Sequence, residues 1–250
     1  MSGRNNTEFS HPRLAIIAAL QREIAPIIHS WKHRDVEHGG KTLRFYESEK
    51  AVLVCGGIGA SAAYLAAEAV TKLYQPQTLV SVGLAGSLSN DIKVGQAFFA
   101  AQVIDAASGK IYPANSGTNI LVTVGKISGS EEKRALAQRF SAHAVDMEAA
   151  AVAEVASQAK LPFFAVKAIS DELEFPMPPM DKFVDATGNF ATSRFVLHAA
   201  LRPAMWPVVF RLARNTNLAA RALAPLIQNL IENQDLPANA IESKLARLDS

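Results

Sequence analysis

The sequence predicts an α/β protein with three layers, in which helices cover both faces of a central mixed, mostly parallel β-sheet. Short apolar runs, typical of buried strands, alternate along the chain with longer alanine-rich or amphipathic stretches, typical of helices. Clusters of glycine, proline and polar residues separate the two kinds of segment. With 250 residues, 49 % of them hydrophobic and 19 % charged, the chain is long enough for one such domain and too polar for a bundle of membrane spans.

The expected elements follow in chain order. Residues 14–19 form a continuous apolar run, as in a central strand that is buried on both faces. After an amphipathic stretch that ends near residue 30, strands are expected at 42–47, 51–55, 78–82, 98–104 and 120–124, and helices at 60–73 and 131–140. A final strand, helix and strand occupy about 144–171, and we expect them to form a parallel crossover unit. The segment 181–229 is predicted to be largely helical.

Several kinds of site are excluded by what the chain lacks. The single cysteine, Cys55, rules out an internal disulfide and a cysteine-based zinc site. No other grouping has the spacing of metal ligands, so we expect no metal. The turn at 56–59 departs from a dinucleotide fingerprint because Ala62 stands where the third glycine would be. The chain also lacks the serine-nucleophile elbow of the α/β-hydrolases. We expect no cofactor and no nucleic-acid partner.

The last two predicted strands are joined by a helix, and each of them ends in an acidic segment. Asp146 and Glu148 flank Met147 in the first segment, and Ser170 precedes Asp171 in the second. In a parallel crossover both would emerge at the carboxyl edge of the sheet, where open α/β sheets bind ligands. Asp146 and Glu148 would point the same way on an extended chain and suit the vicinal diol of a ribose. The alternatives are helix caps and an Asx turn.

Glu23 is a third acidic candidate, because it directly follows the first predicted strand. The alternative is a solvated glutamate at the start of a helix.

Five short segments stand in a fixed order between residues 14 and 200. They are Ala-Ala-Leu-Gln-Arg-Glu ending at Glu23, Gly-Ile-Gly at 57–59, Val-Gly-Leu-Ala-Gly at 82–86, Val-Asp-Met-Glu-Ala at 145–149 and Ala-Ile-Ser-Asp at 168–171. Together they resemble the nucleoside phosphorylase/nucleosidase superfamily, and within it the methylthioadenosine/S-adenosylhomocysteine nucleosidases. The segment 197–216 resembles the branch called hopanoid-associated phosphorylases, which is linked to removal of adenine from adenosylhopane. The resemblance implies a nucleoside phosphorylase-like fold and a homodimer.

The resemblance also implies a role for each matching residue. Asp171 matches the acid that hydrogen-bonds purine N7 and protonates the leaving base, and Ser170 matches a residue that supports this aspartate. Glu148 matches the ligand of the ribose hydroxyls, and Met147 matches the side chain beneath the sugar. Glu23 matches the glutamate that orients and activates the attacking water.

Other matches concern the base and the nucleophile. The Ile127 backbone matches a contact to the purine edge, and Ala85 and Gly86 lie in the matching substrate loop. Leu84 stands where the hydrolases have serine, and Lys126 stands where an aromatic side chain stacks on adenine. These two departures remove a polar contact near the nucleophile and a stacking contact to the base, so the resemblance does not fix the base preference.

The implied chemistry agrees with the residues. Cleavage of an N-glycosidic bond passes through an oxocarbenium-like sugar, and the leaving purine needs a proton. Asp171 can supply it near neutral pH if burial favours its protonated form, whereas Glu148 is expected to be ionised. We therefore expect an N-ribosyl hydrolase that acts on a 5′-substituted adenosine. Water is favoured as nucleophile because the loops at Gly57 and Gly83 carry no arginine and Glu23 would repel phosphate.

Two other functions remain open from the sequence. The first is a phosphate-dependent nucleoside phosphorylase that acts on a hydrophobic nucleoside such as adenosylhopane. The second is a non-catalytic nucleoside-binding or membrane-associated protein.

The chain divides into three expected parts: a disordered N-terminus at 1–12, the nucleoside phosphorylase-like domain at 13–200 and a helical, basic and apolar extension at 201–250. From Arg194 to Ile231 there are five arginines and no acidic residue. An amphipathic helix with Trp206 and an arginine face suits an anionic membrane surface, and packing on its own domain or on a subunit partner is the alternative. The polar N-terminus lacks the apolar stretch of a signal peptide, and no apolar segment is long enough to span a bilayer. The expected location is cytoplasmic, with peripheral contact to the inner membrane surface through this helix.

Overall fold

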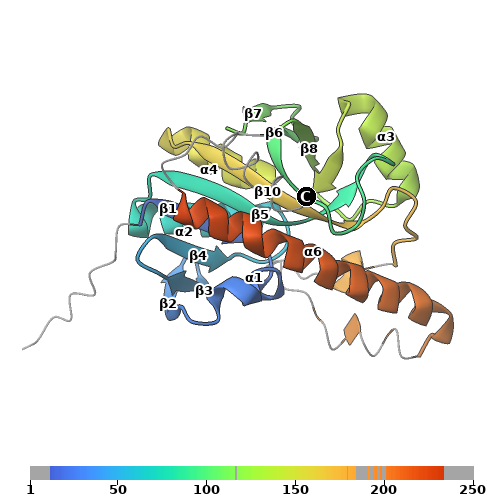
Figure 1. Cartoon of the computed structure of the whole chain (residues 1–250), viewed down its shortest axis with the longest axis horizontal. Coiled ribbons are helices and arrows are strands. Elements are labelled where there is room, and N and C mark those ends of the chain that lie inside the picture. The colour runs from blue at the N-terminus through green and yellow to red at the C-terminus, as the bar shows by residue number, and fades with distance from the viewer. Residues whose placement is uncertain are drawn as a thin grey trace, which may run out of the picture.

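The computed structural model describes residues 12–115, 117–178, 180–183, 191, 194–195, 198 and 201–233. Nearly all of the predicted disordered segment 1–12 lies outside these residues. The predicted alternation of strands and helices is confirmed (Figure 1). The strands are β1 Leu14–Ala18, β2 Lys32–His38, β3 Lys41–Glu47, β4 Ala51–Cys55, β5 Thr78–Ser87, β6 Ala97–Asp105, β7 Ile111–Pro113, β8 Asn119–Thr123, β9 Ala144–Asp146 and β10 Phe163–Asp171. The helices are α1 Gln21–Ile28, α2 Ala60–Tyr74, α3 Ser130–Phe140, α4 Ala149–Ala159 and α6 Trp206–Glu232, with short 3₁₀ turns at Asp181–Phe183 and Pro203–Met205.

The sequence does not predict β2 and β7, and both lie at the margin of the sheet. β2 forms a hairpin with β3 and leaves every residue partly or fully exposed. Because an edge strand of this kind buries no continuous apolar face, the charged sequence of β2 carries no signal for a strand.

The sheet is mixed and closes partly on itself. β4, β1, β5 and β10 are neighbours that run parallel, and β3 and β2 continue the sheet antiparallel at one side. On the other side, β6 is antiparallel to β10, β8 is parallel to β6 and β9 is parallel to β8. β9 then pairs back onto β5. The strands β5, β10, β6, β8 and β9 therefore form a closed ring at one end of the sheet.

The expected direction of β9, parallel to β10 in a crossover unit, is wrong. β9 pairs antiparallel with β5, whereas β10 pairs parallel with it, so the unit of β9, α4 and β10 is not a parallel crossover. The two acidic segments nevertheless meet, because Gly86 near the end of β5 pairs with Val145 on one side and with Asp171 on the other. The expected closeness of the two segments is confirmed, and the reason for it is ring closure.

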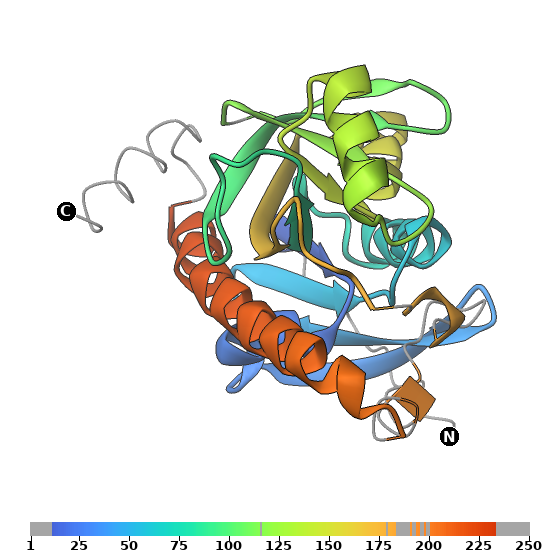
Figure 2. The same ribbon diagram turned by 90° about the vertical axis from the view of Figure 1, so that its right-hand side faces the viewer.

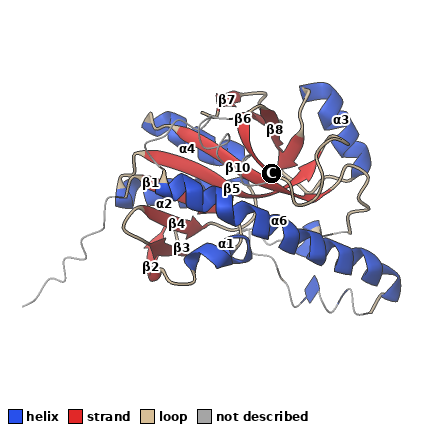
Figure 3. Ribbon diagram, viewed as in Figure 1, coloured by secondary structure: helices blue, strands red, loops and turns tan. Residues whose placement is uncertain are grey.

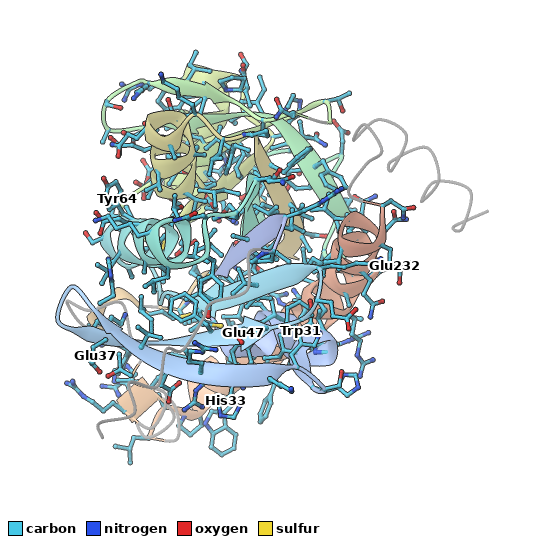
Figure 4. All side chains as sticks on the ribbon, turned by 90° about the vertical axis from the view of Figure 1, so that its left-hand side faces the viewer. Trp31, His33, Glu37, Glu47, Tyr64 and Glu232 are labelled. Atoms are coloured by element: carbon cyan, nitrogen blue, oxygen red, sulfur yellow. The ribbon has the colours of Figure 1, made fainter. Side chains whose placement is uncertain are left out.

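Helices cover both faces of the strands, which confirms the predicted three layers (Figure 3). α2 and α4 pack on each other on one face, and α1 and α6 pack on each other on the opposite face. Figure 2 shows α6 running diagonally along its face of the sheet. Tyr64 on α2 and Glu232 at the end of α6 lie on opposite sides of the strands (Figure 4).

α6 contributes to the hydrophobic core over its second half. Leu223, Ile227 and Leu230 are buried in one cluster with Ile16 of β1 and Ile24 of α1. This contact agrees with the alternative in which the C-terminal helix packs on its own domain. The predicted domain boundary at residue 200 remains a prediction. In the described part of the chain, no helix combines the length and the apolarity that a membrane span needs.

Candidate functional site

A cavity of about 370 Å³ lies where the ring of strands meets α6. The ends of β1, β5, β9 and β10, the loop after β8 and the N-terminal half of α6 line it. Every sequence-predicted site residue lines this cavity, namely Glu23, Ala85, Gly86, Ile127, Asp146, Met147, Glu148, Ser170 and Asp171. Five separate segments of the chain thus bring their residues to one place.

Glu148 immediately precedes α4 and contacts the glycine turn that follows β4. Its Oε1 accepts a hydrogen bond from the Gly59 N–H at 2.7 Å, and its Oε2 lies 3.3 Å from the Met147 N–H. Burial, and then repulsion from Asp146, raise the pKa of Glu148 to about 7. Glu148 therefore releases its proton less readily than a solvated glutamate, and its ionisation when it binds the diol remains a prediction.

Asp146 lines the cavity, and partners within the protein occupy its carboxylate. Its oxygens accept hydrogen bonds from Thr123 Oγ1 at 2.6 Å and from the Ala149 N–H at 2.9 Å, and the Lys167 ammonium lies 2.9 Å away. Asp146 and Lys167 are both buried. The bond to the first residue of α4 is of the kind that the helix-cap alternative predicts. Lys167 in turn donates to Ser81 Oγ at 3.0 Å.

Glu23 is buried in the first turn of α1, with 4 % of its surface exposed. The solvated alternative is therefore wrong. Its Oε2 accepts from the Leu20 N–H at 3.3 Å, which closes the start of the helix. Burial raises the pKa of Glu23, and the Leu20 N–H, Lys167 and Arg22 oppose this rise. A Cβ on Gly83 would lie 3.3 Å from Glu23 Oε2 and 3.7 Å from Lys167 Nζ, so Gly83 leaves room for both groups.

Asp171 ends β10 and is held from two sides. Ser170 Oγ donates to Oδ1 at 2.7 Å, and the Lys133 ammonium, which comes from α3, forms a short ion pair with Oδ2. Lys133 also donates to the Glu172 carbonyl at 2.8 Å and is only 1 % exposed. Sequence reasoning did not find Lys133. A lysine in the polar first half of a surface helix normally points to water, and nothing in its spacing marks it as buried.

The residues that depart from the family pattern also line the cavity. Leu84 precedes Ala85 near the end of β5, and Lys126 lies on the loop after β8. The Lys126 side chain is 68 % exposed, and its ammonium lies 3.6 Å from Glu132. It is therefore directed largely to solvent rather than across the cavity.

The end of the cavity next to α6 is apolar. Val209, Leu212 and Ala213 of α6 line it together with Met177 and Met180 of the loop that follows β10. Phe195 also lines this end. The segment that follows β10 thus borders the cavity. The N-terminal half of α6 thus lines the cavity, whereas its C-terminal half packs in the hydrophobic core.

Comparison with known proteins finds relatives over most of the chain. A family model described as the phosphorylase superfamily matches residues 13–118 and 116–197. An aminodeoxyfutalosine nucleosidase of Campylobacter jejuni is 26 % identical over 196 residues, which cover 64 % of this chain and 86 % of that protein. A 5′-methylthioadenosine/S-adenosylhomocysteine nucleosidase of Bacillus subtilis is 28 % identical over 200 residues, which cover 64 % of this chain and 85 % of that protein.

Solved structures share the fold. A 5′-methylthioadenosine/S-adenosylhomocysteine nucleosidase of Colwellia psychrerythraea in complex with adenine superposes with a TM-score of 0.67 at 20 % identity, over 90 % of this chain and 96 % of that one. A futalosine hydrolase of Helicobacter pylori superposes with a TM-score of 0.62 at 18 % identity, over 85 % of this chain and 96 % of that one. At this identity the likeness concerns the arrangement of the sheet and helices.

Proposed function

We propose, because this chain belongs to the phosphorylase superfamily, that it is a purine nucleosidase that hydrolyses the N-glycosidic bond of a 5′-substituted adenosine. The relatives named above are nucleosidases, and their names concern adenosine-type and futalosine-type nucleosides. The observation that carries the proposal is that Glu23, Glu148 and Asp171, from three distant segments, line one cavity. Each carboxylate has a different environment and therefore a different role.

Asp171 acts on the base in this proposal. The Ser170 hydroxyl and the Lys133 ammonium hold its two oxygens, so the carboxyl group has one orientation in the cavity, which Ile127 also lines. As the glycosidic bond lengthens, negative charge develops on the purine, and Asp171 delivers a proton to N7. A positioned acid of this kind contributes about 10²–10⁴-fold to the rate.

Glu148 and Met147 hold the sugar. The Gly59 N–H fixes one oxygen of Glu148, and the carboxylate accepts hydrogen bonds from the ribose hydroxyls once it has lost its proton. Asp146 acts indirectly, because its carboxylate is taken up by Thr123, Ala149 and Lys167. It fixes the start of α4 and thereby the position of Glu148.

Glu23 activates water in this proposal, and three contacts favour water over phosphate. The Gly59 N–H, which could bind an anion, already binds Glu148. Lys167 is paired with Asp146, and Lys133 is paired with Asp171. Of the described basic residues that line the cavity, Lys133 pairs with Asp171 and Lys126 lies 3.6 Å from Glu132. This leaves Arg22, and the neighbouring Glu23 repels a dianion. Burial raises the pKa of Glu23, which suits a group that must accept a proton from water.

The test is release of adenine from 5′-methylthioadenosine by the native protein, Asp171→Asn and Glu172→Gln. Asparagine keeps the shape of Asp171 but has no proton to give, so base release is expected to fall by at least about 10²-fold. Glu172 is the exposed neighbour, and its variant should retain native activity. Equal rates for Asp171→Asn and the native protein would refute the assigned role. A native protein that binds nucleosides without turnover would favour the non-catalytic alternative.

The second candidate is a phosphorylase that acts on a hydrophobic nucleoside such as adenosylhopane. The apolar end of the cavity at Met177, Met180 and Val209 favours a bulky apolar 5′ substituent. A panel of 5′-alkyl adenosines, assayed with and without phosphate, separates the candidates. Strict phosphate dependence would refute hydrolysis, and a rate that rises with 5′ chain length would identify the substituent class. We also propose a homodimer, for which sedimentation should give twice the 26.8 kDa chain mass.

We further propose that the exposed side of α6, with the segment just before it, contacts an anionic membrane surface. Phe210 is 71 % exposed and Leu201 is 73 % exposed, and the exposed Arg214 and Arg221 lie on the same side of α6 as Phe210. Apolar side chains among arginines suit the headgroup region of an anionic bilayer.

Sedimentation with vesicles of phosphatidylglycerol and phosphatidylcholine tests the membrane contact. The native protein should sediment with anionic vesicles and not with phosphatidylcholine alone, and Phe210→Asp should abolish this binding. Ile111→Asp is the matched control, since Ile111 is 56 % exposed on β7, away from α6. Equal sedimentation of the two variants would refute the contact.

A further inference from the structure

Lys133 is a buried cation in direct contact with Asp171, the proposed acid. It lies in the first half of α3, is 1 % exposed and lines the cavity. Its ammonium forms an ion pair with Asp171 Oδ2 and donates to the Glu172 carbonyl at 2.8 Å, with the Asp171 carbonyl 3.5 Å away. The three hydrogens of the ammonium are thus all directed at the end of β10.

Gly86 provides the space for this pair. A Cβ at Gly86 would lie 2.9 Å from Asp171 Oδ2, 3.0 Å from Lys133 Cε and 3.1 Å from Lys133 Nζ. Any larger residue would therefore displace the pair. The glycine of the substrate loop, the acid and the cation fit together as one unit at the base side of the cavity.

We propose that Lys133 is a positioning residue for base release, which holds the Asp171 carboxyl group in place and offsets the negative charge that develops on the departing purine. The proposal rests on the proposed function, because it gives Lys133 a role through Asp171. A cation next to the reacting edge stabilises developing charge most strongly where water is excluded. A role limited to anchoring α3 is the competing explanation.

The surrounding charges make Lys133 the cation that faces Asp171. On α3, Arg134 pairs with Glu174 at 2.5 Å, and both side chains are more than half exposed. Glu132 lies 3.6 Å from Lys126. On the loop after β10, Glu172 is exposed and Glu174 is occupied by Arg134. Among the described residues, Lys133 is the cation in ionic contact with Asp171.

The Arg134–Glu174 pair supplies a matched control. Like Lys133, Arg134 links α3 to the segment that follows β10, but it does so on the surface. If Lys133 only anchors the helix, Lys133→Met and Arg134→Met should affect the protein through stability alone. If Lys133 acts through Asp171, only the Lys133 variants should change the rate and its pH dependence in the folded protein.

The experiment measures kcat, KM and the pH profile of adenine release for Lys133→Met, Lys133→Gln and Arg134→Met, with folding checked by circular dichroism. We expect kcat to fall roughly tenfold to a hundredfold in both Lys133 variants, with KM within about threefold, as for a misplaced catalytic group. The pH profile should change in the two Lys133 variants and not in Arg134→Met, because Lys133 contacts the Asp171 carboxyl group and Arg134 contacts Glu174. Arg134→Met should match the native protein.

Three outcomes would overturn the inference or separate it from the proposed function. Folded Lys133 variants with native kcat and pH profile would overturn it. Loss of the fold in both Lys133 variants would assign Lys133 to structure alone and also overturn it. Asp171→Asn in the same assay serves as the reference: an inactive Asp171→Asn with fully active Lys133 variants refutes this inference only, whereas an active Asp171→Asn refutes the proposed function itself.

Discussion

Glu148→Gln should stabilise the protein, and it should do so more at pH 8 than at pH 5. The carboxylate is desolvated next to Asp146, which raises its pKa from 4.5 to about 7. A group whose pKa is higher in the folded state contributes stability below its ordinary pKa and loses it as the pH rises through the folded value. The native protein should therefore lose stability between pH 5 and pH 8, and the glutamine variant should lack this part of the loss.

The magnitude follows from the two pKa values. The difference between 4.5 and about 7 corresponds to at most about 3 kcal/mol. Glu148 is only half-buried and faces the cavity, so water in the cavity reduces this value. We expect the variant to gain about 1–3 kcal/mol relative to the native protein between pH 5 and pH 8. The glutamine Oε1 can still accept from the Gly59 N–H, so the turn remains supported.

Urea denaturation at the two pH values provides the assay. The difference in unfolding free energy between Glu148→Gln and the native protein should rise from pH 5 to pH 8. Glu172→Gln is the control, since Glu172 is exposed and its charge stays in water in both states. A stability difference that is constant with pH, or one that falls, would refute the assigned cause of the raised pKa.

Three further predictions concern the same site. Asp146→Asn should destabilise the protein by about 3–5 kcal/mol in urea denaturation, because it leaves Lys167 buried without its counter-charge. Asp35→Asn, which breaks the exposed pair with Arg44, should have a much smaller effect, and similar losses for the two variants would contradict the account. KM for the nucleoside should fall as the pH rises through about 7 in the native protein, because Glu148 must ionise to bind the diol, and Glu148→Gln should lack this step in its pH profile. Gly86→Ala should lower kcat, because the added Cβ would displace Asp171 and Lys133. Gly125→Ala is the control, since a Cβ there meets nothing within 4 Å, and its kcat should be close to native. Equal kcat values for the two variants would show that the space at Gly86 is not needed.

The sequence predicted the elements that bury a continuous apolar face. The runs that became β1, β4 and β5 are apolar because both faces of these strands are covered, and the alanine-rich α2 and α4 pack closely on each other. The charged β2 has no such constraint and was missed. Closure of the ring was also missed, because the pairing of the short β9 with β5 is a long-range contact that local pattern does not encode.

The acidic residues of the site could be predicted because strand ends and motif order mark them. What each carboxylate contacts could not be predicted. Asp146 and Glu148 are separated by one residue and both line the cavity, yet Asp146 pairs with the buried Lys167 and Glu148 accepts from the Gly59 N–H. Lys133 was missed because its partner lies 38 positions away, and only the tertiary fold brings the two groups together.

The central claim is that water, activated by Glu23, attacks the sugar while Asp171 protonates the base. Turnover of 5′-methylthioadenosine in ¹⁸O-labelled water, with and without phosphate, tests it most directly. The account predicts adenine release at the same rate in both buffers, with the label in the released sugar, and loss of both in Glu23→Gln. Release that requires phosphate and yields an unlabelled sugar phosphate would contradict it.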